Sequence, residues 1–134
     1  MIAVDTNILV RYAVKDDRKQ TVAATNFLKS NHCRILKTVL LEVAWVLSSS
    51  SGYHLSRSAV VERLRHICGL PTIVVEDASD VARAIGWYEQ GMDIADALHL
   101  TASISCSGFA TLDKRLVAKG AKIAGESATI LSVI

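Results

Sequence analysis

Proline, glycine, cysteine and aromatic residues are all scarce in this sequence, and each scarcity excludes a class of protein. One proline and seven glycines among 134 residues argue against a loop-rich fold. The cysteines are odd in number and form no C-x-x-C pair, so a disulfide framework is not expected. We expect Cys33, Cys68 and Cys106 to be free, buried thiols in a reducing compartment. The histidines and cysteines also lack zinc-binding spacing.

Long apolar runs and a strong excess of one charge are missing as well. No stretch of about 20 apolar residues is present to span a membrane, and Asp5 and Arg11 interrupt the N-terminal segment before an export signal can form. The 15 basic and 13 acidic residues give a net charge of +2, which neither establishes nor excludes a nucleic-acid partner. We therefore expect a cytoplasmic protein with no membrane contact.

The apolar content, by contrast, is ample for one folded domain over residues 1–134, because hydrophobic residues make up 51% of the chain. Short β-type runs alternate with longer helical patterns. The predicted strands are Ile2–Val4, Arg34–Leu36, Thr72–Val75, Gly108–Leu112 and a last short strand or tail at Thr129–Val133. The predicted helices are Thr21–Lys29, Val39–Leu47, a helix capped by Ser56 and broken by Pro71, Glu76–Gln90, Asp93–Ser105 and a short one after Asp113.

Strands that alternate with helices predict an α/β fold with parallel pairing, in which ligands bind beyond the carboxyl ends of the strands. Asp5 directly follows the first predicted strand, and Asp113 follows the fourth. Asp93 and Asp96 lie three residues apart at the start of a helix, so they share one face. Glu42 stands in an otherwise apolar helix. These positions predict an acidic site at one rim of the sheet.

Each acidic residue also has a purely structural interpretation. Asp5, Asp93 and Asp113 are good helix or turn caps, and for Asp93 the capping role is favoured. Glu42 can pair with a surface cation. Together, however, carboxylates that converge would repel one another unless a cation neutralised them. Oxygen ligands suit Mg²⁺ or Mn²⁺, which activate water for phosphodiester hydrolysis.

Four segments of the chain resemble, in order, the acidic motifs of PIN-domain ribonucleases. They are Val4-Asp5-Thr6-Asn7-Ile8-Leu9, Leu40-Leu41-Glu42-Val43, Asp93-Ile94-Ala95-Asp96-Ala97-Leu98-His99 and Ala110-Thr111-Leu112-Asp113. The likeness runs through essentially the whole chain and is greatest to the VapC toxins of bacterial type II toxin–antitoxin systems. Leu116 stands where that family often has Phe, which changes packing and not chemistry.

The resemblance implies a three-layer α/β/α domain with a central, mainly parallel sheet of four or five strands. It implies an endoribonuclease that uses Mg²⁺ or Mn²⁺ to cut tRNA, rRNA or mRNA, forms a homodimer and is neutralised by a VapB-type antitoxin. Asp5, Glu42, Asp96 and Asp113 fall on the family's catalytic and metal-binding positions. Asp93, Thr6 and Thr111 match supporting positions beside the pocket.

Other residues admit two interpretations. Two predicted helices have apolar faces that either bind a partner segment or pack in the core. They are Val39–Leu47, which includes Trp45, and Ser56–Ile67. For His99, Trp87 and Tyr88 we favour packing over contact with substrate. Arg11, Lys114 and Arg115 either contact phosphates or are solvated surface.

Two other functions are compatible with parts of the pattern. An aspartyl-phosphate enzyme would also place an Asp after its first strand, but it usually needs a second Asp where this chain has Asn7. A PIN-like module that binds RNA or protein without cutting is the main alternative, although such a module has no need of four acidic positions.

Overall fold

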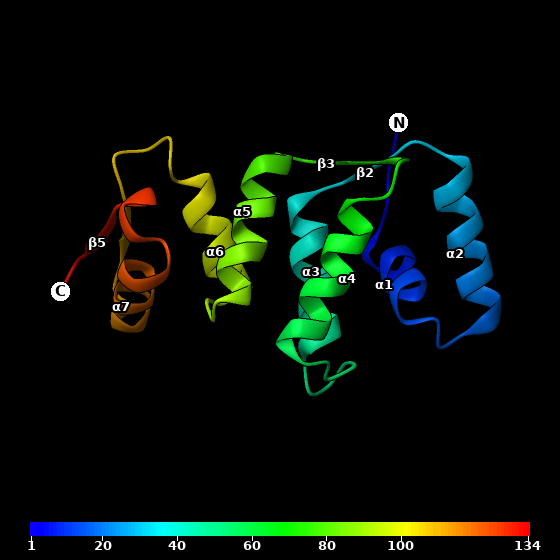
Figure 1. Cartoon of the computed structure of the whole chain (residues 1–134), viewed down its shortest axis with the longest axis horizontal. Coiled ribbons are helices and arrows are strands. Elements are labelled where there is room, and N and C mark those ends of the chain that lie inside the picture. The colour runs from blue at the N-terminus through cyan, green and yellow to red at the C-terminus, as the bar shows by residue number, and fades with distance from the viewer. The chain divides into compact units, whose positions relative to one another are not determined.

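The computed structural model describes residues 1–134, and alternating strands and helices run along the whole chain (Figure 1). The strands are β1 (Ile2–Ala3), β2 (Cys33–Ile35), β3 (Ile73–Val75), β4 (Phe109–Thr111) and β5 (Ile130–Ser132). The helices are α1 (Thr6–Val14), α2 (Arg18–Ser30), α3 (Lys37–Ser48), α4 (Arg57–Cys68), α5 (Ala78–Glu89), α6 (Ile94–Ala102), α7 (Lys114–Ile123) and a 3₁₀ turn, η1 (Gly125–Ser127). None of the helices has the length and apolar character needed to cross a membrane.

The chain divides into two units, Met1–Ala78 and Ser79–Ile134. The first unit contains a parallel sheet in the order β1-β2-β3, with Cys33 of β2 opposite both Ile2 of β1 and Ile73 of β3. The central strand is the most deeply buried, because Cys33 and Ile35 have no exposed surface. Parallel neighbours require helical crossovers, and α1 to α4 supply them.

Helices α1 to α4 form the core of the first unit by packing their apolar faces together. Helix α1 contacts α2 and α3, and α3 contacts α4, which lies beside it in Figure 1. Leu9, Leu40, Leu47 and Leu64 are completely buried at these contacts. Burial of such side chains contributes about 1.5–3 kcal/mol each in water-to-core transfer, so these helices fix the strand ends that precede them.

The second unit has its own small sheet, in which β4 and β5 pair in parallel, and α7 packs against both strands. Its buried residues include Val81, Ala84 and Leu100. Helix α7 approaches β5 closely at Gly120, where a Cβ atom would meet the Ile130 side chain at 1.9 Å. A larger residue at position 120 would therefore require the Ile130 side chain to move.

The predicted α/β class with parallel strands is confirmed, and the five strands lie in sheets of three and two. Helix α1 was not predicted. Its segment is rich in Thr, Asn, Ile and Val, residues with modest helix propensity, and tertiary packing of Leu9 and Val10 overrides that preference. Helix α2 begins three residues earlier than predicted, because Asp17 caps it by accepting a hydrogen bond from the backbone of Gln20.

Candidate functional site

Asp5 and Glu42 belong to the first unit, where the structure links them through Thr6. Asp5 is the N-cap of α1, and its carboxylate accepts a 2.7 Å hydrogen bond from the Thr6 backbone N–H. The Thr6 side chain is buried, and its hydroxyl donates to the Glu42 carboxylate on α3. One residue at the start of α1 thus holds two carboxylates that lie 37 positions apart in sequence.

A cavity of about 440 Å³ opens at this point. Both carboxylates line it, and so do polar and apolar groups of α1, α3 and the turn after α3. The lining residues are Asp5, Thr6, Asn7, Val10, Arg11, Glu42, Val46 and Tyr53. The predicted acidic residues of the first unit therefore face one cavity that also contains a cation.

That cation, Arg11, is fixed by two groups that were not predicted. Its guanidinium donates to the Asp16 carboxylate at 2.9 Å and to the Tyr53 hydroxyl at 3.2 Å. Tyr53 in turn donates to Asp16 at 2.8 Å. This hydrogen bond from Tyr53, followed by the one from Arg11, lowers the pKa of Asp16, and the same bond raises the pKa of Tyr53. The network holds the Arg11 guanidinium beside the cavity.

The position of Tyr53 depends on the glycine before it. A Cβ atom on Gly52 would lie 2.1 Å from the Val46 carbonyl oxygen, so no other residue fits without a shift of the backbone. The same carbonyl accepts a 3.1 Å hydrogen bond from the Tyr53 N–H. A lone glycine after a run of serines is the sequence signal for such a close backbone approach.

Asp93, Asp96 and Asp113 belong to the second unit. Asp93 caps α6 by accepting from the Asp96 N–H at 3.2 Å. Asp113 caps α7 by accepting from the backbones of Arg115 and Leu116. The Thr111 hydroxyl accepts a 3.0 Å bond from the Asp113 N–H.

The pKa of Asp96 is raised above its ordinary value. Burial is the largest cause, because it disfavours the charged form, and the neighbouring charges of Asp93 and Asp113 add to it. His99 and Lys119 oppose the shift. Asp96 thus lies among like charges that a bound cation would relieve.

The capping interpretation is confirmed at Asp5, Asp93 and Asp113. Glu42 is held by a hydroxyl and not by the cation considered for it. Capping uses only some of the lone pairs of these carboxylates, so each still has lone pairs that can bind another group.

The aromatic residues and His99 divide by exposure. Trp87 and Tyr88 are buried, as predicted, while Trp45 on α3 is 59% exposed. His99 is exposed and stacks on Phe109, with 6.2 Å between the ring centroids. The cysteines are free. Cys33 is buried as expected, whereas Cys106 is exposed, and burial raises the pKa of Cys68 to about 11.

No three acidic, histidine or cysteine side chains are arranged as a group that could hold a metal ion. The donors at both acidic sets are nevertheless carboxylate oxygens, the type that Mg²⁺ and Mn²⁺ prefer. Mg²⁺ commonly binds one or two carboxylates and completes its shell with water and phosphate oxygens. The Asp5–Glu42 pair and the Asp96–Asp113 pair each fit that requirement in donor chemistry.

In parallel α/β units ligands bind beyond the carboxyl ends of the strands, and Asp5 and Asp113 lie there. The family model of the PIN domain matches residues 2–122, and the chain belongs to this family. PIN domains are a nuclease-type fold, are generally hydrolases and generally use divalent metals. No curated protein and no solved structure matches the chain.

Proposed function

We propose that this PIN-domain protein is a metal-dependent endoribonuclease, the toxin of a VapBC-type toxin–antitoxin pair. The observation that carries the proposal is the cavity of the first unit, where the Asp5 and Glu42 carboxylates face the same space as the Arg11 guanidinium. Carboxylates beside a fixed cation are what hydrolysis of a phosphodiester needs, because one group binds the metal and the other the phosphate.

The proposal assigns Asp5, Glu42, Asp96 and Asp113 to one reaction. Its support is the order of the acidic motifs along the chain, the PIN match over residues 2–122 and the geometry within each unit. Thr6 holds the Glu42 carboxylate, whereas Asp93 and Thr111 accept from the backbone N–H groups of Asp96 and Asp113. Bound Mg²⁺ or Mn²⁺ would lower the pKa of water and stabilise charge on the phosphate.

The chain's own residues prepare the substrate. Thr6 fixes the Glu42 carboxylate, so that this group needs no reorganisation when it binds. Arg11 is always charged, and its network with Asp16 and Tyr53 directs it at the cavity. Its role is to bind a phosphate oxygen and to stabilise negative charge as the bond to the leaving oxygen breaks.

The antitoxin and the homodimer belong to the same proposal. Exposed Trp45 on α3 is the kind of aromatic residue that protein interfaces use. An antitoxin segment that covers the α3 side of the first unit would also restrict access to Glu42, which lies one turn before Trp45 on the same helix. Cytoplasmic RNA is then the expected substrate.

The experiment is cleavage of total RNA by the purified protein with Mg²⁺, with Mn²⁺ and with EDTA. We expect discrete fragments in the presence of metal and none with EDTA. The Asp5→Asn variant is expected to lose cleavage and keep its fold, because Asn also caps helices. Circular dichroism and thermal unfolding of the variant provide the control.

The alternative is a PIN-like module that binds RNA or protein without cutting. Metal binding, shown by calorimetry, together with no cleavage of any RNA would favour this module and contradict the proposal. Cleavage that persists in Asp5→Asn at high purity would contradict the assignment of the site.

A further inference from the structure

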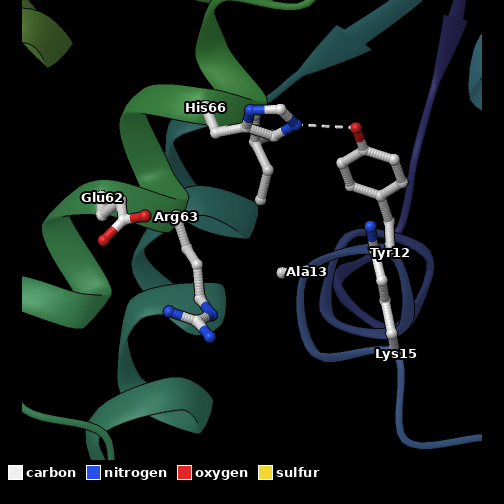
Figure 2. Close-up of a pocket in the computed structure, with 7 residues that line it drawn as sticks. Tyr12, Ala13, Lys15, Glu62, Arg63 and His66 are labelled. Atoms are coloured by element: carbon white, nitrogen blue, oxygen red, sulfur yellow. Dashed lines mark hydrogen bonds between the residues drawn. The ribbon is translucent and has the colours of Figure 1, made fainter.

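A second cavity of the first unit lies between α1 and α4, and none of the acidic site residues lines it (Figure 2). Its volume is about 270 Å³, and its polar groups come from Tyr12, Lys15, Glu62, Arg63 and His66. It lies at the end of α1 opposite Asp5. At 1.5 Å per residue, Lys15 is about 15 Å from Asp5 along the helix.

Arg63 lines this cavity, and one donor of its guanidinium is unused. Its Nε atom is buried and has no hydrogen-bond partner, and its Nη1 atom reaches only the Ala59 carbonyl of its own helix, at 3.4 Å. In Figure 2 the guanidinium lies apart from the Glu62 carboxylate, which projects elsewhere from α4. A buried donor without an acceptor costs about 1–3 kcal/mol, so the guanidinium would gain from a small movement that brings this N–H to an acceptor in the cavity.

The opposite wall, on α1, supplies a second cation and a rigid aromatic surface. Lys15 adopts a left-handed backbone conformation with φ of 60°, and its ammonium lies 5.7 Å from the centre of the Tyr12 ring. Tyr12 and His66 stack with ring centroids 5.7 Å apart, and the Tyr12 hydroxyl is 2.8 Å from His66 Nε2. This pair joins α1 to α4 across the cavity.

The charge balance of the cavity favours an anion. Lys15 and Arg63 are both cationic, and neither forms an ion pair with a carboxylate, since the ion pairs of the protein lie elsewhere. Glu62 is the only acidic residue in the lining, and it is exposed. Donors on two different helices suit an anion with oxygens in several directions, such as a phosphate, better than a flat carboxylate with two oxygens.

We propose that this cavity binds a phosphate group, and that the phosphate comes from the backbone of an RNA chain engaged at the Asp5–Glu42 cavity. The choice of RNA rests on the proposed function. The cavity would then hold the RNA strand at a second point and set its direction across the first unit.

The test measures binding rather than cleavage. A fluorescent single-stranded RNA is titrated with the full-length Asp5→Asn protein in Mg²⁺, and its anisotropy is recorded at several salt concentrations. Adding Arg63→Gln or Lys15→Gln is expected to weaken binding about tenfold at low salt. Each change should also reduce the slope of log affinity against log salt by about 0.7, the value for one phosphate contact on a single strand.

Matched controls are available on α2 of the same unit, where Arg18 and Lys19 are exposed and line no cavity described here. Arg18→Gln and Lys19→Gln remove the same charges and are expected to change the affinity less than threefold. Equal losses in control and test variants would overturn the proposal, because the effect would then be general charge. Lys15→Gln changes an exposed residue, so the test survives even if Arg63→Gln does not fold.

A second arm identifies the source of the phosphate. Inorganic phosphate is added to the protein at constant ionic strength, and the His66 ring signals are followed by NMR. A shift that Arg63→Gln abolishes, together with the loss of RNA affinity, supports the proposal in full. The shift without any loss of RNA affinity would support a phosphate site but overturn RNA as its source. If both the NMR shift and the loss of RNA affinity were absent, the proposed phosphate site would be overturned.

Failure of this inference and failure of the proposed function are distinguishable. A protein that cuts no RNA but still loses RNA affinity on Arg63→Gln keeps the phosphate site and lacks the nuclease activity. A protein that cuts RNA while all four substitutions leave its affinity unchanged keeps the activity and lacks the site.

Discussion

The two units of the molecule hold their acidic side chains in different ways. In the first, hydrogen bonds from Thr6 hold Asp5 and Glu42 beside the Arg11 guanidinium. In the second, Asp96 lies partly buried among the charges of its neighbours, and its pKa is raised as a result. The first arrangement is already satisfied within the protein, whereas the second gains most from a bound cation.

The distribution of charge follows the same division. Residues Met1–Ala78 include ten basic and seven acidic residues, and residues Ser79–Ile134 include five and six, which together account for the 15 and 13 of the chain. The first unit is therefore net positive and the second net negative. Under the proposed function, we therefore expect the first unit to contribute most to phosphate binding and the acidic residues of the second to gain most from a metal ion.

The largest expected effect is the loss of cleavage when either acidic set is changed, the Asp5–Glu42 pair or the Asp96–Asp113 pair, and it tests whether both sets serve one reaction. Asp5→Asn and Asp96→Asn are each expected to lower the cleavage rate by about a thousandfold or more, and the double variant by little more than either alone, because groups that act together are not additive. Single-turnover cleavage rates of the three variants measure this. If the effects multiplied in the double variant, the two sets would act independently.

A smaller effect separates the two threonines. Thr6→Val keeps the shape of a buried side chain but removes the donor to Glu42, and we expect cleavage and metal affinity to fall about tenfold, as for other residues that orient a ligand. Thr111→Val removes only an acceptor for the Asp113 N–H. It should cost about 0.5–1.5 kcal/mol of stability and leave the cleavage rate within about threefold.

Metal titrations and urea unfolding of both variants make this comparison. The reverse result, with Thr111→Val impairing activity more than Thr6→Val, would show that the second unit and not the first depends on a fixed hydroxyl.

The smallest effect is a pH dependence in the metal-free protein. Because the pKa of Asp96 is higher in the folded state, the folded protein takes up a proton before the unfolded chain does as the pH falls. The wild type should therefore gain stability relative to Asp96→Asn between about pH 7 and pH 4. The gain stays below about 1 kcal/mol, because solvent screens a carboxylate this exposed.

Unfolding in EDTA at several pH values measures that gain. Asp5→Asn serves as the control. If the wild type gained the same stability relative to Asp5→Asn as the pH fell, the gain would not be specific to Asp96.

Much of the fold followed from patterns in the sequence. The strand predicted at Thr72–Val75 is indicated by β-branched residues that follow a proline. Ser56 caps α4, as predicted. Helix α1 was not predicted because many of its residues favour strands locally. The Asp5 cap and the burial of Leu9 and Val10 against other helices together make it helical. The packing contribution cannot be read from the local sequence.

The site was predictable to a similar extent. The acidic residues stand out because carboxylates in apolar surroundings need a reason, and Thr6 stands out by its position next to Asp5. Asp16 and Tyr53 do not, because they meet Arg11 only after the turn at Gly52 folds back. The buried Nε atom of Arg63 likewise depends on how α4 packs, which no single residue type reveals.

Three of the acidic residues, Asp5, Asp93 and Asp113, begin helices as well as carrying the charge that the proposed chemistry needs. Asparagine satisfies the same backbone N–H groups, so the fold does not enforce the charge. Replacing these three aspartates with asparagine would therefore remove the charge that the proposed reaction needs and still leave a folded protein.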